Sequence, residues 1–448
     1  MRVIVVGAGE VGSSIAASLA DEHEVVVVDV DGDRVEALTY DLDVLAIEGD
    51  GAAIETLQEG GLAAAELLIA VTDDDETNIV SCGTAKTLDD VTTIARVRNT
   101  KYLDTWENAE GALGVDVMVG TNLLTARKIA SIIGLPAARD VDSFADGTIQ
   151  MAEFELAAGS PVAGQTVAEA DRFDDLTFAA IICPDDEADC EEIVIPRGDT
   201  RLSAGDEVIV IGTDEAVTAF SHAVAPDDDY HDVLLVGGSS VGYQTARLLE
   251  QRGIRAKLIE RDPERAQFLA ESLPKTTVLE ADATDRDFLE SENIDAVDVV
   301  VTTLESDEAN LLAGLFAKRL GADRAIAVVE EGSYVDLFET VGIDVAVQPR
   351  EVAAEEITRF TREEHAENVA IIESDRAEVI EIEIDDESVF CDRTIQSAAA
   401  DLPGGVVVGA IVRDGEFVRP RGDTVVHAGD HVVFFVEATA LEETLAKI

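Results

Sequence analysis

Hydrophobic and polar positions alternate along the first thirty residues in a way that predicts a strand, a helix and a second strand. Arg2 to Val6 is a short, β-branched apolar run, which is typical of a buried parallel strand. Ile15, Ala16 and Leu19 then follow at helical spacing. A second apolar run covers Val25 to Val28. The pattern predicts a β-α-β unit at the start of the chain.

Three glycines, spaced as Gly-x-Gly-x-x-Gly, separate the first strand from the helix. Gly7 permits a tight turn, Gly9 lets a diphosphate approach the backbone because it has no Cβ atom, and Gly12 allows helix and strand to pack closely. The N–H groups at the helix N-terminus would then meet the phosphate. Asp29 ends the second strand, where its carboxylate could accept hydrogen bonds from a ribose diol and would repel a 2′-phosphate. This order predicts a dinucleotide-binding turn.

The alternation of strands and helices continues to about Pro136. Apolar runs at Val44–Ile47, Leu67–Val71, Thr92–Val97 and Val115–Val119 predict further strands. Helices are predicted between them, and the last one covers Asn122–Ile133. Strands that alternate with helices indicate a doubly wound parallel α/β sheet.

After Pro136 short alternating runs replace the long helices and predict a small α+β module that ends near Val224. An acidic stretch with a proline, residues 225–230, reads as a linker, and a new strand begins at His231. We therefore expect a Rossmann-like domain at 1–136, a small α+β domain at 137–224, a second Rossmann-like domain at 231–364 and a second small domain at 365–448.

Internal repetition supports this division. Glu260 stands in the second half where the first half has Asp29, after a second glycine turn that begins at Gly237. The repeated motifs are Glu48-Gly49-Asp50-Gly51 with Glu280-Ala281-Asp282-Ala283, Asp75-Glu76-Thr77-Asn78 with Asp307-Glu308-Ala309-Asn310, and Gly205-Asp206-Glu207 with Gly429-Asp430-His431. The chain is therefore interpreted as a tandem duplication.

The charge is extreme, with 94 acidic against 32 basic residues and a net charge of −62 over 448 residues. Only seven of the basic residues are lysines, and the acids are spread along the chain. A hydrophobic content of 47% excludes a disordered acidic protein, and the lack of a basic face argues against nucleic-acid binding. An acidic, lysine-poor, ordered chain is typical of a halophilic protein, because high salt screens self-repulsion.

No apolar run is long enough to cross a bilayer, and the first strand begins where a signal peptide would stand, so we expect a soluble, cytoplasmic protein. His427 and His431 lie in a turn-to-strand segment, where their spacing does not suit a metal, and no metal is expected. The cysteines show no CxxC or zinc spacing and are expected to be reduced thiols: Cys82, Cys183, Cys190 and Cys391.

The order of motifs resembles the regulator-of-potassium-conductance (RCK) family. In its doubled form it resembles the TrkA family, the cytosolic subunits of Trk potassium uptake systems. The motifs are VVGAGEVG from Val5, EGDG from Glu48, AVTDDDETN from Ala70, IARVR from Ile94, VDVVVTTLESDEAN from Val297, AKRLGA from Ala317, LPGGVVVGAIVRDG from Leu402 and AGDHVVFFV from Ala428. They span essentially the whole chain.

This resemblance implies a peripheral regulatory subunit, and not an enzyme. It would lie on the inner face of the cell membrane as a homo-oligomer, a tetramer of doubled chains. Nucleotide binding would gate potassium uptake through a TrkH-like membrane subunit. The ligands implied are NAD(H), ATP or ADP, bound at the carboxyl ends of the strands.

The resemblance also implies which residues bind the nucleotide. In the first copy the glycine turn would bind the phosphates, and Asp29 would bind the ribose. Asp50 and Gly51 would lie beside the base or the ribose. Arg98 would contact a phosphate, although it could instead pair with surface acids. The first-copy set is Gly7, Ala8, Gly9, Glu10, Val11, Gly12, Asp29, Asp50, Gly51, Thr72, Asp73 and Arg98. The second-copy set is Gly237, Gly238, Ser239, Ser240, Val241, Glu260 and Asp282.

The second copy departs from the pattern at its middle glycine. Ser239 stands there, and its side chain would crowd the diphosphate path. Val328 and Glu330 occupy the positions of Arg96 and Arg98, which removes a cation and adds an anion. We therefore expect the second site to bind weakly, to prefer a smaller or less charged adenine nucleotide, or to be structural.

Two other functions remain open from the sequence. An NAD-dependent dehydrogenase would need a catalytic base and a substrate domain, and the small modules carry no obvious acid–base set. A purely structural interaction protein would not need the intact first glycine turn. The acidic run Asp73–Glu76 could attract a cation, but helix capping explains it better.

Overall fold

The computed structural model describes residues 1–20, 23–109, 112–183, 193–226, 232–283, 297–362, 368–372, 377–386 and 388–448. These residues form two compact units. One unit comprises residues 1–129 and 232–358, and the other comprises residues 130–231 and 359–448. Each unit therefore contains parts from both halves of the duplicated chain.

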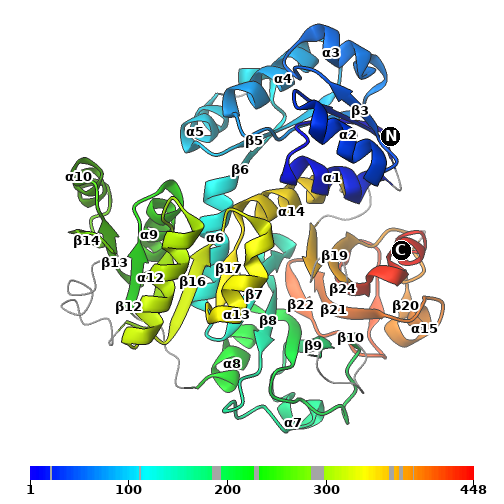
Figure 1. The fold of residues 1–448 in the computed structure, drawn as a ribbon. Helices are drawn as coiled ribbons and strands as arrows, with labels where there is room; N and C mark the ends of the chain where they lie inside the picture. The colour runs from blue at the N-terminus through cyan, green and yellow to red at the C-terminus, as the bar shows by residue number, and fades with distance from the viewer. Residues whose placement is uncertain are drawn as a thin grey trace. The chain divides into compact units, whose positions relative to one another are not determined.

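The first half begins with a six-stranded parallel sheet in the order β3-β2-β1-β4-β5-β6 (Figure 1). Its strands are β1 (Arg2–Val6), β2 (Glu24–Asp29), β3 (Leu45–Glu48), β4 (Leu67–Ala70), β5 (Thr92–Val97) and β6 (Val117–Gly120). Its helices are α1 (Glu10–Ala20), α2 (Gly32–Asp41), α3 (Ile54–Glu59), α4 (Asp75–Leu88), α5 (Thr100–Asn108) and α6 (Thr121–Gly134). The order in which strands are added reverses between β1 and β4, because β2 and β3 lie on one side of β1 and β4 to β6 lie on the other. Such sheets bind ligands at this point.

The second half repeats this sheet in the order β14-β13-β12-β15-β16-β17. Its strands are β12 (Asp232–Val236), β13 (Arg255–Glu260), β14 (Thr277–Glu280), β15 (Val299–Thr302), β16 (Arg324–Val328) and β17 (Val345–Val347). Its helices are α9 (Ser240–Arg252), α10 (Pro263–Ser272), α12 (Asp307–Leu320), α13 (Val335–Val341) and α14 (Pro349–Arg362). The predicted doubly wound fold is therefore confirmed in both halves.

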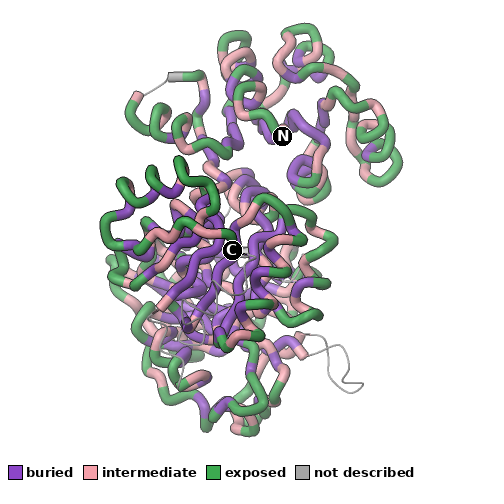
Figure 2. The backbone as a smooth tube through the Cα atoms, turned by 60° about the vertical axis from the view of Figure 1, so that its left-hand side comes forward, coloured by how far each residue is buried: buried purple, intermediate pink, exposed green. Residues whose placement is uncertain are grey.

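Burial explains why the central strands are continuous apolar runs. Val3 to Val5 in β1 have no exposed surface, and Val299 to Val301 in β15 are equally buried. Helices cover both faces of such a strand, so both sets of alternating side chains are removed from water. Figure 2 shows the buried residues concentrated along the strands, with exposed residues on the outer turns of the helices.

The last helices of the two large domains contact one another. Lys128 on α6 and Glu355 on α14 form an ion pair of 3.5 Å, and both side chains are largely buried. The observed α6 contains the predicted helix Asn122–Ile133, and α14 has the same place at the end of the second sheet. The two halves of the duplication therefore meet through these helices within one chain.

The small domains are antiparallel, as the short alternating runs predict. The first has the order β10-β9-β11-β8-β7 and the second β18-β19-β24-β21-β22, with a separate β20-β23 pair. The first contains β7 (Ala138–Phe144), β8 (Ile149–Glu155), β9 (Leu176–Ile182), β10 (Ile193–Val194), β11 (Glu207–Thr213), α7 (Val167–Ala170) and α8 (Asp214–Val224). The second contains β18 (Asn368–Ile372), β19 (Ala377–Glu383), β20 (Arg393–Thr394), α15 (Ile395–Ala399), β21 (Val406–Arg413), β22 (Glu416–Val418), β23 (Val425–Val426), β24 (His431–Glu437) and α16 (Leu441–Leu445).

The two small domains share one hydrophobic core. Phe144 and Ile211 of the first pack in the same cluster as Ala410 and Phe435 of the second. Gly409 lies so close to Ile211 that an added Cβ atom would stand 2.5 Å from its Cδ1 atom. Any larger residue there would force the two sheets apart. The duplicated halves therefore pack together in the small domains as well.

The structure describes three of the four cysteines, and Cys190 lies outside the described residues. Cys183 is disulfide-bonded, so the expectation of four reduced thiols is wrong for this residue, whereas Cys82 and Cys391 are free. Spacing along the chain detects zinc and redox motifs, but a disulfide depends on which residues the fold brings together. Residues 227–230 of the predicted linker lie outside the described residues.

The repeated Gly-Asp motif of the small domains forms a turn held by its aspartate. The Asp206 carboxylate accepts a hydrogen bond of 2.7 Å from the Ser203 N–H, and the Asp430 carboxylate accepts one of 2.8 Å from the His427 N–H. The Asp430 side chain is only 2% exposed, and Arg413 donates to both of its oxygens at 2.7 Å. Burial acts to raise the pKa of Asp430, but Arg413 and the His427 N–H together lower it below its usual value.

We expect Asp430→Asn to lower the free energy of unfolding by about 2 kcal/mol at neutral pH, because it leaves the Arg413 guanidinium without its charge partner. The carboxylate with a lowered pKa stabilises the fold above the unfolded-state value near 4, and this contribution disappears as acid protonates it. Melting temperatures of wild type and variant should therefore converge in acid. Asp423→Asn, at an exposed position, is the control. Curves that stay parallel down to the acid limit would contradict the assignment.

Candidate functional site

The glycine turn after β1 has the close contacts that the sequence predicts. Gly7 has a φ of +112°, which only glycine adopts readily, and its N–H donates to the Val28 carbonyl oxygen at 2.8 Å. A Cβ atom added at Gly12 would lie 1.8 Å from the Gly7 carbonyl oxygen. Both glycines are therefore required by the packing of α1 against the end of β1.

Gly9 has a different role, because space lies beside it. An added Cβ atom would meet only the Arg34 Nη1 atom, at 3.4 Å. α1 begins at Glu10, so the first N–H groups of this helix face the turn with no side chain at Gly9 to cap them. N–H groups in the first turn of a helix, together with the positive end of the helix dipole, can receive an anion such as phosphate.

The Asp29 carboxylate is bonded to the glycine turn itself. One oxygen accepts a hydrogen bond from the Ala8 N–H, and the other accepts one of 2.8 Å from the Asp31 N–H. A carboxylate can accept about four hydrogen bonds, so capacity remains for a ribose hydroxyl. In this structure the Asp29 carboxylate holds the glycine turn in place.

A cavity of about 530 Å³ lies at the carboxyl ends of these strands, within the size range of small-molecule sites. It is lined by Val6, Gly7, Gly9, Glu10, Val11, Val28, Asp29, Val30, Arg34, Gly49, Asp50, Gly51, Val71, Thr72, Asp73, Asp74, Thr77, Arg96 and Arg350. Nine of the residues predicted from the first copy are among them. Three others, Ala8, Gly12 and Arg98, do not line it.

Buried polar contacts order the side of the cavity formed by β4 and β5. The Asn78 side chain, fully buried, accepts from the Thr72 N–H at 2.9 Å and donates to the Arg96 carbonyl oxygen at 2.8 Å. Asp74 is the N-cap of α4 and accepts from the Thr77 N–H at 2.7 Å. Helix capping within the acidic run is thereby confirmed.

Four arginines surround this cavity or approach it. The Arg96 side chain is 4% exposed, and its Nε donates to the Thr121 hydroxyl at 3.1 Å. Burial lowers the pKa of Arg96, and Asp73 opposes that effect. Arg98 is turned toward Asp73, whose carbonyl oxygen accepts from its guanidinium. Arg34 and Arg350 complete the set of lining cations.

Arg350 reaches this cavity from the second half of the duplication. It is the second residue of α14, and its Nη1 atom lies 2.8 Å from the Glu10 Oε2 atom. The Gln348 side-chain amide donates to the other Glu10 oxygen. Arg350 is not among the residues predicted from the motifs, because nothing along the chain tells which residues of the second copy face the first copy's turn.

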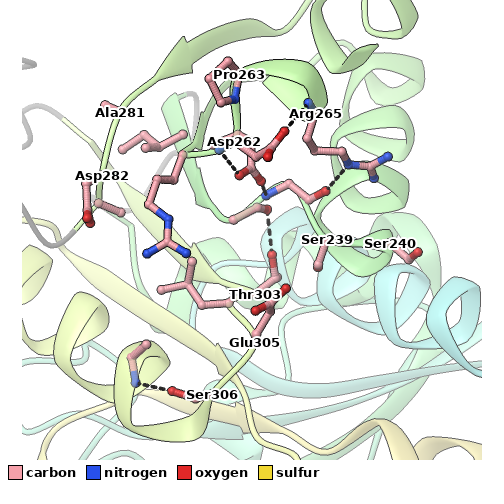
Figure 3. Close-up of a pocket in the computed structure, with 18 residues that line it drawn as sticks. Ser239, Ser240, Asp262, Pro263, Arg265, Ala281, Asp282, Thr303, Glu305 and Ser306 are labelled. Atoms are coloured by element: carbon pink, nitrogen blue, oxygen red, sulfur yellow. Dashed lines mark hydrogen bonds between the residues drawn. The ribbon is translucent and has the colours of Figure 1, made fainter. Parts of the chain in front are cut away.

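The second glycine turn also opens into a cavity, of about 880 Å³ (Figure 3). It is lined by Gly237, Gly238, Ser239, Ser240, Ile259, Glu260, Arg261, Asp262, Pro263, Arg265, Ala281, Asp282, Ala283, Thr303, Leu304, Glu305, Ser306 and Ala309. Six of the seven residues predicted from the second copy line it, and Val241 does not. The Glu260 carboxylate accepts from the Gly238 N–H at 2.8 Å, as Asp29 does from Ala8.

Ser239 distinguishes this second turn from the first. It is the N-cap of α9, and its hydroxyl accepts from the Gly242 N–H at 3.2 Å. The side chain therefore occupies an N–H group that a phosphate would otherwise use. In this structure α9 thus caps itself, and crowding of a diphosphate by Ser239 stays a prediction.

The two turns also differ in the charged residues around them. Val328 ends β16 where Arg96 lies in β5, and Glu330 follows it in place of Arg98. Aligning β6 with β17 places Asn122 at the position of Arg350. At these three positions the first turn has arginines near it that the second turn lacks, whereas the second cavity gains Arg261 where the first is lined by Val30.

Family models match the chain twice each. The TrkA-N domain matches residues 3–120 and 233–349, and the TrkA-C domain matches residues 151–224 and 379–448. The resemblance seen in the motifs is thereby confirmed, and so is the duplicated order of domains.

Curated relatives are similar over nearly the whole length. The Trk system potassium uptake protein TrkA homolog 1 of Methanosarcina mazei is 36% identical, and the alignment covers 99% of each chain. The Trk system potassium uptake protein TrkA of Halomonas elongata is 34% identical over 97% of this chain and 96% of its own. Among solved structures, the GsuK channel bound to NAD has a TM-score of 0.62 at 19% identity, covering 99% of this chain and 79% of that one. That likeness concerns the fold.

We expect Gly12→Ala and Gly9→Ala to differ sharply in stability. The Cβ atom at residue 12 must displace the Gly7 carbonyl, which should lower the free energy of unfolding by about 1–3 kcal/mol. The Cβ atom at residue 9 meets one flexible side chain, so the change should stay within about 0.5 kcal/mol. Thermal melting of the purified full chain without ligand measures both. Equal destabilisation would show that the space beside Gly9 does not exist in solution.

Proposed function

Because the chain belongs to the TrkA family of potassium uptake proteins, we propose that it is a regulatory subunit that binds an adenine nucleotide at the first glycine turn and thereby controls a membrane potassium transporter. The observation that carries the proposal is the uncapped N-terminus of α1 at Gly9, which opens into a cavity with three lining arginines.

The lining residues suit a nucleotide in three respects. The N–H groups of α1, with Arg96 and Arg350, suit phosphates. Asp29 and Asp50 suit ribose hydroxyls. Val30 lines the cavity and is 72% exposed, so it offers an apolar surface for a base. These groups would hold NAD(H), ATP or ADP, and the NAD-bound state of the GsuK channel supports the first of these.

Regulation without catalysis fits the chemistry of the cavity. Among the described residues that line it, the ionisable side chains are aspartate, glutamate and arginine only. Its described lining holds no histidine, lysine or tyrosine that could exchange a proton with a dehydrogenase substrate near neutral pH. We therefore propose that the nucleotide is bound and released unchanged.

The partner is a TrkH-like membrane subunit on this proposal. In the described part of the chain, no helix combines the length and apolar character needed to span a membrane. Potassium would therefore pass through another protein, with this chain attached at the inner face of the membrane as a homo-oligomer, a tetramer. Control requires that the nucleotide bind two conformations of the assembly with different affinities.

The nucleotide should bind more tightly at the first turn than at the second. We expect Gly9→Ser to weaken binding about tenfold, because a serine there can cap α1 as Ser239 caps α9. Calorimetric titration of NADH, NAD, ATP, ADP and AMP in about 1 M KCl, which suits an acidic chain, measures this. Ser239→Gly is the matched control and should leave the tight site unchanged.

Asp29→Ala should also weaken nucleotide binding in the same titration, and Arg98→Ala tests whether Arg98 can leave Asp73 for a phosphate.

Potassium uptake tests the regulatory role directly. Cells that lack their own TrkA-type subunit but keep the membrane subunit should regain rubidium or potassium influx when this chain is supplied. The Gly9→Ser variant should restore less influx at equal expression. Full restoration by the Gly9→Ser variant, at a nucleotide concentration at which calorimetry shows its first site to be mostly empty, would refute control by the nucleotide.

A further inference from the structure

We propose that Arg350, supplied by the second half of the duplication, reads the charge of the phosphates bound at the first turn by exchanging its ion pair with Glu10 for the ligand. This inference rests on the proposed function, because it concerns the regulation of the same site. It adds a residue that the motifs of the first half do not contain.

Glu10 occupies an unusual position for a carboxylate. It is the first residue of α1, beside the N–H groups that would receive a phosphate. Its side chain is 39% exposed, and both of its oxygens contact the second half of the chain, through Arg350 and Gln348. Gly332 also approaches it, since an added Cβ atom there would lie 2.4 Å from the Glu10 Oε1 atom. Three residues of the second half therefore lie against Glu10, namely Gly332, Gln348 and Arg350.

Arg350 faces both Glu10 and the cavity. Its side chain is 26% exposed and lines the cavity, as that of Arg96 does, and its Nη1 atom lies 3.4 Å from the Glu330 carbonyl oxygen. Burial acts to lower the pKa of Arg350, but Glu10, Asp73 and Glu330 raise it overall, so it keeps its charge. A single cation thus stands between a protein carboxylate and the place where phosphates would bind.

A bound phosphate and Glu10 then compete for the same guanidinium. Bringing a second negative group close to the Glu10 carboxylate is unfavourable unless a cation is shared or one group withdraws. Arg350 can form two parallel hydrogen bonds with either group, and the ligand with more charge attracts it more strongly. ATP and ADP should therefore draw Arg350 away from Glu10 more effectively than the diphosphate of NADH, and adenosine should leave the pair intact.

The second turn lacks this arrangement. Ser240 stands at the position of Glu10, and Asn122 at the position of Arg350. The Asn122 side-chain amide donates to the Arg98 carbonyl oxygen at 2.8 Å. Among the described residues, the first site is therefore the one that connects the ligand's charge to a contact between the two halves, and breaking the Glu10–Arg350 pair would loosen that contact.

The test is a set of dissociation constants for ATP, ADP, NADH and adenosine, measured by calorimetry on the full chain in about 1 M KCl. Arg350→Gln should weaken ATP binding about tenfold or more, NADH binding less, and adenosine binding within about twofold. Glu10→Gln removes the competitor and should tighten ATP binding. Arg319→Gln, at an exposed position on α12 that lines neither cavity, is the matched control and should change nothing.

The outcomes separate this inference from the function on which it rests. If wild type binds none of the four ligands, the proposed function fails. If wild type binds them but Arg350→Gln weakens all four equally, or none, Arg350 does not read charge and the inference fails. Because Glu10→Gln is expected to act in the opposite direction, it tests the inference even if Arg350→Gln does not fold. A Glu10→Gln variant that binds ATP more weakly would also overturn it.

Discussion

The close approach of α1 to the end of β1 is the constraint on which the first site depends. With hydrogen in place of a Cβ atom at Gly12, the helix reaches the Gly7 carbonyl, and its first N–H groups face the cavity. The Asp29 carboxylate then holds the turn from the neighbouring strand. Because sterics place the helix and two hydrogen bonds fix the turn, the proposed ligand would not have to order this geometry when it binds.

Duplication produced two such turns, and small side-chain changes gave them different chemistry. The backbone arrangement is the same, since Glu260 bonds to the second turn as Asp29 does to the first. The two turns differ in the side chains that surround this backbone. Ser239 caps its own helix, and Glu330 stands where the first copy has an arginine. Packing and ligand affinity depend on different atoms. The fold can therefore be kept while the polar groups around a turn change.

The two halves also depend on one another. Lys128 pairs with Glu355 between α6 and α14, and the small domains share a core around Ile211 and Gly409. The Glu10–Arg350 contact belongs to this same set, but it alone lies at a cavity. An ion pair at such a place is exposed to replacement by a ligand, whereas the hydrophobic core of the small domains is not. On the proposed mechanism, the contacts that hold the halves together are therefore separate from the contact that responds to a ligand.

The sequence by itself determined the α/β fold, the duplication, and most of the residues around both turns. These follow from local physics, since β-branched runs form buried strands and a glycine spacing permits one turn geometry. Only the tertiary structure decided that Arg98 turns to Asp73, that Arg96 and Arg34 line the cavity, and that Arg350 enters it from residues some 340 positions away in the chain. The physical reason is that side-chain partners depend on distance in space, and a pattern read along the chain carries no information on which helix of one half will face the turn of the other.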